Sequence, residues 1–252
     1  MKIVISKKAK IGNNVKIEEY AIIRDDVEIG NNVVIGSCSK IDNGARISDD
    51  VKIHHGAVVS TIPQDLKFKD EYTLLKVGKG TVIREFATLN RSTGVRPETK
   101  IGENCLIMAY AHVAHDCIVG NNVIMANSAE LGGHVEIGDF VVLGGIVGVH
   151  QFSKIGAHAM ISALSYVNKD VPPFIVAGKK PIQYEGLNVV GLKRRGFTSE
   201  RIEKIKSVYD IIYRSKYNVS DALKKIKDSI EPDEDVNLIV NFIETSNRGI
   251  IR

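Results

Sequence analysis

The chain has 252 residues, 44% of them hydrophobic and 25% charged, so it can hold a large domain and a smaller one and is not composed like a disordered protein. Its formal net charge of +4 does not indicate a nucleic-acid partner, and we expect none. The first residues contain no apolar run of signal-peptide length, and no stretch is as long as a membrane span. We therefore expect a cytoplasmic protein without a transmembrane segment.

The residue types indicate how the interior is filled. Tryptophan is absent and aromatic residues make up 6% of the chain, whereas Ile and Val recur throughout, which favours strands. The three cysteines are Cys38, Cys105 and Cys117. Their odd number and their spacing indicate neither a disulfide framework nor a structural metal site. We expect no metal and no cofactor.

A repeat of six residues predicts the fold. Aliphatic residues stand at every sixth position through residues 5–59, again through 77–89, and once more through 101–167. The fifth position of most hexads is small or β-branched, and Gly-Asn-Asn or Asp-Asp often follows. Neither a helix nor an ordinary strand has this period, and a β-sandwich would alternate with period two. Three hexads close a triangular coil of 18 residues, so the repeat predicts a mainly β protein built as a parallel β-helix.

Two interruptions and one change of pattern divide the chain. We expect residues 1–187 to form the β-helix, with insertion loops at 60–76 and 90–100 that leave the coil at its corners. Such insertions often carry binding function. From Thr198 onward apolar residues recur at helical spacing, with Ser199 and Ser220 as candidate N-caps. We expect residues 188–252 to form a small C-terminal α-helical domain.

The 18-residue coil converts sequence positions into columns on the outside of the prism. His115 lies 18 residues before Gly133, and Asp116 lies 18 residues before His134. The residues that share this corner are His112, His115, Asp116, Gly133, His134, His150 and Gln151. Four of the seven histidines of the chain therefore gather in one patch, which favours a functional site over separate solvated histidines.

The corner has the parts of an acyl-transfer site. A neutral His115 can take a proton from a hydroxyl or an amine that attacks a carbonyl, and Asp116 can orient the imidazole. The N–H of Gly133 can stabilise the resulting oxyanion, because no Cβ blocks the approach. The column contains no Ser or Cys, which favours direct transfer over an acyl-enzyme.

Two other classes of protein remain as alternatives at this point. The histidines could bind zinc between subunits, as in trimeric β-helical carbonic anhydrases, which this architecture resembles. Those enzymes pair histidines five residues apart, whereas His112 and His115 are three apart. A purely structural β-helix would leave the corner cluster unexplained.

Eight segments resemble the UDP-N-acetylglucosamine O-acyltransferases of lipid A biosynthesis, a hexapeptide-repeat family. They are IPQDLKFK from Ile62, IREFATLNR from Ile83, AHVAHDCIVGNN from Ala111, LGGHVEIGDF from Leu131, GVHQFSKIGAHAMI from Gly148, DVPPFIVAG from Asp170, GLKRRGF from Gly191 and the closing RGIIR. The resemblance implies a left-handed β-helix, a homotrimer with sites between subunits, and transfer of a 3-hydroxyacyl chain from acyl carrier protein to the 3-position of UDP-N-acetylglucosamine. The N-acyltransferase of the same pathway has an additional N-terminal domain, and a 3-amino acceptor stays open as an alternative.

The resemblance also implies roles for individual residues. His115 would be the general base, Asp116 its orienting partner and Gly133 the oxyanion donor. The substrate-binding residues would be Asp65, Lys67, His112, His134, His150, Gln151, Ala163, Asn188, Arg194 and Arg195. Of these, Asn188 and the two arginines would contact the nucleotide, and Ala163 stands where the family often has a glycine that limits acyl-chain length.

Two further features concern the C-terminal part of the chain. Val190 occupies a position where the family commonly has an acidic residue. Acyl carrier protein is acidic, so basic residues of the helical domain are candidate docking points. These are Lys193, Arg201, Lys204 and Lys206.

Overall fold

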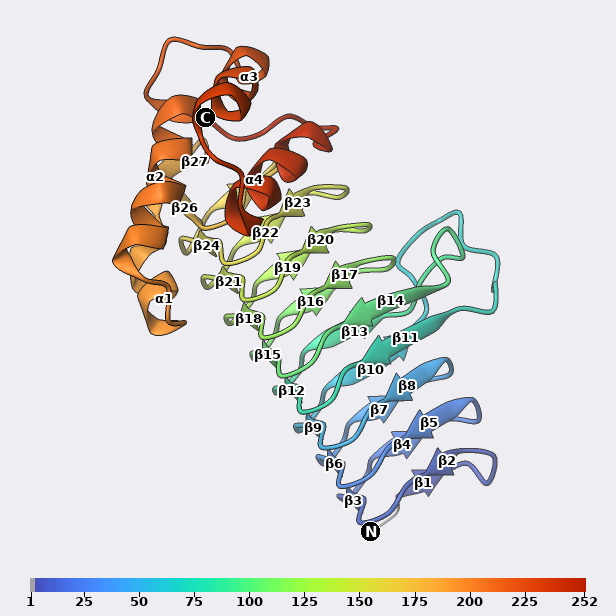
Figure 1. Ribbon diagram of the computed structural model, residues 1–252. Coiled ribbons are helices and arrows are strands. Elements are labelled where there is room, and N and C mark those ends of the chain that lie inside the picture. The colour runs from blue at the N-terminus through green and yellow to red at the C-terminus, as the bar shows by residue number, and fades with distance from the viewer. Residues whose placement is uncertain (1–2) are drawn as a thin grey trace.

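The computed structural model describes residues 3–252, which form a three-sided prism of stacked strands with helices at one end (Figure 1). Each side of the prism is one sheet, and we name the sides sheet A, sheet B and sheet C. From Val4 to Val167, consecutive strands along the chain visit the three sheets in turn. The predicted mainly β fold, a left-handed parallel β-helix with a C-terminal group of helices, is confirmed.

The strands are short, and most contain two residues. Sheet A contains β1 (Val4–Ile5), β4 (Ile22–Ile23), β7 (Lys40–Ile41), β10 (Val58–Thr61), β13 (Thr88–Asn90), β16 (His112–Val113), β19 (Glu130–Leu131), β22 (Gly148–Val149) and β25 (Tyr166–Val167). Sheet B contains β2 (Lys10–Ile11), β5 (Val27–Ile29), β8 (Ala45–Ile47), β11 (Leu74–Val77), β14 (Glu98–Ile101), β17 (Ile118–Val119), β20 (Glu136–Ile137) and β23 (Lys154–Ile155). Sheet C contains β3 (Lys16–Ile17), β6 (Val34–Ile35), β9 (Lys52–Ile53), β12 (Val82–Ile83), β15 (Leu106–Ile107), β18 (Ile124–Met125), β21 (Val142–Leu143), β24 (Met160–Ile161), β26 (Ile175–Gly178) and β27 (Gln183–Leu187).

The register explains why the hexad pattern persists. Val113 pairs with Leu131, and Leu131 pairs with Val149, so equivalent residues of successive coils stack in parallel. The aliphatic residue of each hexad and the small residue two before it point inward, as Ala111 and Val113 do with no exposed surface. Because each coil covers the apolar face of the next, the core is one continuous column of aliphatic side chains.

The two insertion loops are shorter than predicted. They span residues 62–73 and 91–97 rather than 60–76 and 90–100, because the strands on both sides extend into the predicted breaks. The pairing of Leu74–Val77 with Glu98–Ile101 adds backbone hydrogen bonds that the hexad pattern does not reveal. Both loops connect sheet A to sheet B. They therefore leave the prism along one edge, which we name the A–B edge.

Four helices follow the last strand. They are α1 (Val189–Arg194), α2 (Ser199–Tyr213), α3 (Val219–Ser229) and α4 (Glu234–Glu244). The two predicted N-caps were wrong: Thr198 caps α2 and Asn218 caps α3, in place of Ser199 and Ser220. Thr198 and Asn218 have the extended backbone of a cap, whereas the two serines are already helical. Among residues 3–252, no helix is both long and apolar enough to cross a membrane.

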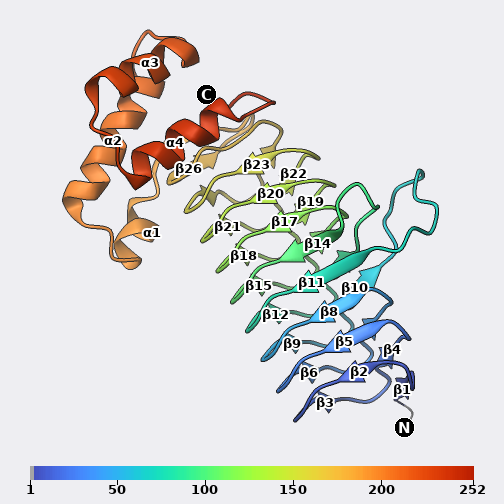
Figure 2. The ribbon, with the colours of Figure 1, turned by 45° about the vertical axis from the view of Figure 1, so that its right-hand side comes forward.

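The helices lie at the C-terminal end of the prism (Figure 2). The fully buried Tyr209 of α2 donates a hydrogen bond of 2.6 Å to the carbonyl of Pro173. Beyond α4, the hydroxyl of Ser246 donates to the buried carboxylate of Asp170 at 2.6 Å, and the amide of Lys154 donates to the same carboxylate at 2.8 Å. The chain end is thus bonded directly to the last coils.

Candidate active site

The histidine corner lies on the A–B edge, where the chain turns from β16 into β17. Asp116 and His134 occupy equivalent positions of two successive turns, with φ of 60° and 62°. This left-handed conformation makes the sharp corner and carries both side chains to the same edge. His115 precedes Asp116 in the turn, and Gly133 precedes His134. The predicted columns are therefore present in the structure.

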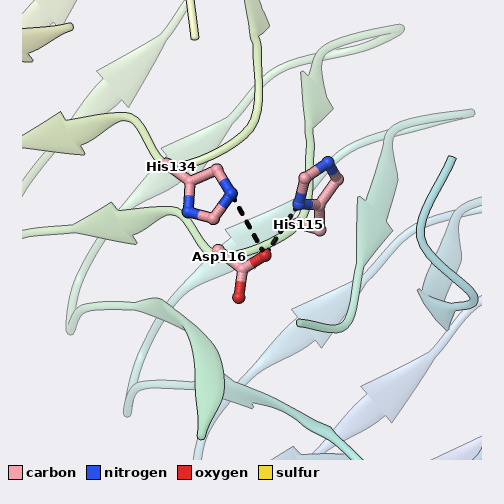
Figure 3. Close-up of side chains that lie close together, drawn as sticks. All are labelled: His115, Asp116 and His134. Carbon is pink, nitrogen blue, oxygen red and sulfur yellow. Dashed lines mark hydrogen bonds and ion pairs between the residues drawn. The ribbon is translucent and has the colours of Figure 1, made fainter. Parts of the chain in front are cut away.

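Three side chains meet at this corner (Figure 3). His115 Nδ1 lies 2.7 Å from Asp116 Oδ2, and His134 Nε2 lies 3.7 Å from the same oxygen. The Asp116 side chain is fully buried, whereas those of His115 and His134 are 12% and 13% exposed. When Nδ1 of His115 donates to the carboxylate, its Nε2 keeps a free lone pair, which is the state a general base needs.

Asp116 is held as an anion. Burial alone would raise its pKa, but hydrogen bonds from His115, Thr93 and Arg96 outweigh burial and lower the pKa to about 2. The carboxylate is therefore ionised at neutral pH. It can stabilise the positive charge that develops on His115 during proton transfer.

Gly133 lies directly over the His115 ring. A Cβ at this position would stand 2.5 Å from His115 Cε1 and 2.8 Å from Nε2, so any other residue would collide with the imidazole. No residue between 3 and 252 accepts a hydrogen bond from the Gly133 amide. That N–H is free to serve a ligand held against His115.

A groove of about 510 Å³ opens beside these residues. Its lining residues are Gln64, His112, Ala114, His115, Glu130, Leu131, Gly132, Gly133, Gly148, Val149, His150, Gln151 and Tyr166. His112 Nδ1 lies 2.7 Å from the Thr88 hydroxyl, and burial lowers the pKa of His112. Burial likewise lowers the pKa of His134, whose ring stacks on Phe152 at 4.4 Å. Both histidines are thus predominantly neutral at neutral pH, and they can donate or accept hydrogen bonds.

A larger groove of about 1110 Å³ follows the outer face of sheet B. The residues that line it include no histidine. The chemistry-bearing side chains gather on the A–B edge, so we assign the site to the smaller groove.

The corner also has the composition of a metal site. Ligand atoms of His115, Asp116 and His134 lie within 4.8 Å of one another. The Asp116 oxygens, however, already accept bonds from Thr93, from Arg96 and from His115, and a metal would have to displace them. The zinc alternative paired His115 with His112, which is bonded to Thr88 and is not part of this group. The arrangement fits an acid–base pair better than a metal centre.

Two predicted substrate residues lie on the first insertion loop. Asp65 Oδ1 accepts a hydrogen bond of 2.9 Å from the amide of Lys67, which closes a tight turn. The preceding residue, Gln64, lines the groove. The loop therefore reaches the same groove as His115 through Gln64, whereas Asp65 and Lys67 do not line it.

The remaining predicted residues lie on the other two edges of the prism. Ala163 is exposed at the turn from sheet C to sheet A. Asn188 caps α1 and donates a hydrogen bond of 2.9 Å to the carbonyl of His158, at the turn from sheet B to sheet C. Arg194 ends α1, and Arg195 donates to Phe140 at that same edge. One chain alone does not bring these residues to the groove.

The sequence missed three residues that support the site. Thr88 contacts His112, and Thr93 and Arg96 contact Asp116. Counting in steps of 18 could not find Thr88, because the second insertion lengthens that step to 24 residues. Thr93 and Arg96 lie within the insertion itself, where no repeat applies.

Two family models and a nearly full-length relative match the chain. A family model described as Udp N-acetylglucosamine O-acyltransferase, Domain 2, matches residues 170–251, and a bacterial transferase hexapeptide model matches residues 8–43 and 98–133. The acyl-[acyl-carrier-protein]–UDP-N-acetylglucosamine O-acyltransferase of Sulfurihydrogenibium sp. is 48% identical over 98% of this chain and 92% of its own length.

Solved structures are similar over the same length. The UDP-N-acetylglucosamine acyltransferase of Bacteroides fragilis superposes with a TM-score of 0.98 at 43% identity, covering 99% of this chain and 98% of that one. The enzyme of Campylobacter jejuni gives a TM-score of 0.93 at 38% identity, covering 99% and 97%. With this similarity over nearly its whole length, the chain belongs to the family of acyl-[acyl-carrier-protein]–UDP-N-acetylglucosamine O-acyltransferases.

Proposed function

We propose that this protein transfers a 3-hydroxyacyl chain from acyl carrier protein to the 3-hydroxyl of UDP-N-acetylglucosamine, as the first step of lipid A biosynthesis. The observation that carries the proposal is His115, held at 2.7 Å by the ionised Asp116 beneath the free amide of Gly133. The Sulfurihydrogenibium relative is named as an acyl-[acyl-carrier-protein]–UDP-N-acetylglucosamine O-acyltransferase, which supports the proposed donor and acceptor. Both substrates are soluble molecules, and we place the reaction in the cytoplasm.

The geometry supports a direct transfer. Nε2 of His115 takes the proton of the sugar hydroxyl while the hydroxyl oxygen attacks the thioester carbonyl. The Gly133 N–H stabilises the oxyanion, the new C–O ester bond forms and the C–S bond breaks. The departing thiolate of the carrier protein then takes the proton from His115. The neighbouring Cys117 cannot act as an acyl acceptor, because it is fully buried and burial raises its pKa to about 12.

We propose that the complete site forms between the subunits of a homotrimer. Asn188, Arg194 and Ala163 lie on edges of the prism other than the one with His115. A neighbouring copy that presents its other edges to the groove would supply those side chains, and it would also provide the second wall of an open groove. The distribution of the predicted residues over three edges supports this proposal.

In the helical domain, three of the four basic residues that were candidates for binding acyl carrier protein form ion pairs within the chain. Arg201 pairs with Asp235, Lys204 pairs with Asp233 at 2.8 Å, and Lys206 pairs with Glu203 at 3.2 Å. These cations are partly neutralised within the chain. We propose that Lys193 contributes more than the other three to the contact with acidic carrier protein.

Product analysis tests the proposed function. Purified protein is incubated with 3-hydroxyacyl carrier proteins of several lengths and with either UDP-N-acetylglucosamine or its 3-amino analogue. We expect mass spectrometry to find the base-labile ester of UDP-N-acetylglucosamine. Preferential formation of the amide would support the N-acyltransferase alternative, and the absence of both products would contradict acyl transfer to a sugar nucleotide.

A further inference from the structure

The second insertion loop, residues 91–97, folds over the catalytic carboxylate. The Thr93 hydroxyl donates a hydrogen bond of 2.7 Å to Asp116 Oδ2. The Thr93 amide lies 3.3 Å from both carboxylate oxygens, and the Arg96 amide donates to Oδ1 at 3.2 Å. Two residues of one loop thus donate hydrogen bonds to both oxygens of the carboxylate.

Two further contacts hold the loop in its conformation, one within the loop and one to a later coil. The buried Ser92 hydroxyl donates to the carbonyl of Arg96 at 2.6 Å, which closes the loop on itself. The Arg96 guanidinium pairs with Glu136 at 2.5 Å, and Lys154 pairs with Glu136 at 3.4 Å. The Arg96–Glu136 pair ties the loop to the second coil beyond its own, so its amides and its hydroxyl are held in place before substrate arrives.

The Thr93 hydroxyl and the His115 ring share one acceptor atom. Each lies 2.7 Å from Asp116 Oδ2. Because the hydroxyl also occupies this oxygen, it helps to keep the carboxylate facing the imidazole. Loss of the hydroxyl would free the carboxylate to rotate and would weaken its hold on the Nδ1–H of His115.

We propose that Thr93 is a positioning residue of the reaction: through Asp116 it sets the orientation and the tautomer of the His115 ring. This inference rests on the proposed function of His115 and Asp116. It assigns the second insertion loop a role in catalysis that does not require contact with substrate.

The test compares three variants with the native protein. Thr93→Val removes the hydroxyl at nearly constant volume, and Thr93→Ser keeps it. Thr73→Val is the matched control, because the buried Thr73 hydroxyl forms no hydrogen bond with any of residues 3–252. Thr73 lies under the same loop, its methyl group 3.9 Å from where a Cβ on Gly94 would stand.

We expect Thr93→Val to lower kcat roughly tenfold to a hundredfold with little change in KM, as for other residues that orient a reacting group. Thr93→Ser and Thr73→Val should both behave as the native protein. A valine variant with native kcat would overturn the proposal, as would one that does not fold.

A second readout separates this inference from the proposed function. In ¹⁵N-labelled protein, the His115 ring should carry its proton on Nδ1 in the native, Thr93→Ser and Thr73→Val forms. Thr93→Val should show a mixture of tautomers. If the native protein forms no ester, the proposed function fails while the NMR result still decides whether Thr93 orients His115 through Asp116. Identical spectra for all four proteins would contradict that role.

Discussion

Ala163 is the residue that we expect to limit the length of the acyl chain. It is exposed at a turn from sheet C to sheet A, and it packs over the Gly144 of the coil below. In a trimer this edge would face a neighbouring groove. The Ala163 methyl group would then occupy the space that the last carbon of a longer chain needs.

Ala163→Gly should therefore shift the preferred donor toward longer chains. One buried methylene is worth about 0.8 kcal/mol and a clash costs about 1 to 3 kcal/mol, so selectivity should change roughly tenfold. Initial rates with 3-hydroxyacyl carrier proteins of increasing length measure the shift. Ala157→Gly is the matched control, because Ala157 has the same corner position on the next edge. An unchanged optimum in Ala163→Gly would place the length limit elsewhere.

At the scale of residues, the sequence predicted the columns and missed the contacts across insertions. His115, Gly133 and Asp116 could be placed because a rigid 18-residue coil turns spacing into position. The position of Thr93 could not be predicted, because a loop has no repeat. Its path depends on its hydrogen bonds to the buried Asp116 carboxylate, which the sequence does not reveal. The sequence also could not reveal that Asn188 uses its side chain to cap α1.

Among the elements, the junction between prism and helices depends on a stack of aromatic rings. His158 lies between Phe140 at 4.9 Å and Phe174 at 5.4 Å, and Phe197, which precedes α2, meets it edge-on at 5.2 Å. Burial, together with the positive charges of Arg195 and Arg201, lowers the pKa of His158 to about 4. The ring is therefore neutral in the folded protein at neutral pH.

His158 should make the protein less stable in mild acid. Its pKa is near 6.5 when unfolded and about 4 when folded, so the unfolded state binds the proton first. The stabilisation is complete above about pH 6.5 and is lost as the pH falls toward 4. From pH 7 to pH 5 we expect a loss of about 1 kcal/mol, allowing for solvent screening of a partly buried ring.

His158→Phe should keep the stack and remove most of this pH dependence. Urea unfolding of native and variant protein at pH 7 and pH 5 measures the difference. His55→Phe, a change at an exposed histidine on another edge, should retain the native dependence. If the free energy of unfolding falls equally between pH 7 and pH 5 in native protein and in His158→Phe, groups other than His158 cause the pH dependence.

The strands could be predicted where the six-residue repeat is regular. The elements that follow the end of the repeat were harder to predict. The hexads predicted the strands of the prism, because every coil repeats the same inward pair of side chains, as at Ala111 and Val113. Helix α1 has only six residues, too few to show a helical period. The antiparallel pairing of β26 with β27 also had no signal in the repeat.

For the whole molecule, the decisive question is whether one site uses two subunits. His115→Ala and Arg194→Ala should each be inactive alone, because they remove the base and a nucleotide contact. We choose Arg194 because Arg195 is bonded to Phe140 within its own chain. Mixed and reassembled trimers should recover about a quarter of native activity, since that share of interfaces joins an intact His115 to an intact Arg194.

The matched control mixes His115→Ala with Asp116→Asn. Both residues lie on the same edge of the same subunit, so no interface in the mixture has a complete pair and activity should stay absent. Activity that recovers in both mixtures, or in neither, would contradict a site shared between subunits. Sedimentation that finds a fully active monomer would contradict it as well.

The central claim is that His115 is the general base of acyl transfer, and one rate comparison tests it most directly. His115→Ala should lower the rate of ester formation by roughly 10² to 10⁴ while the circular dichroism spectrum and the oligomeric state stay native, because the side chain supports no part of the core. His55→Ala, the equivalent corner position on another edge, should leave the rate unchanged. A folded His115→Ala protein whose rate stays within tenfold of the native one would contradict the account.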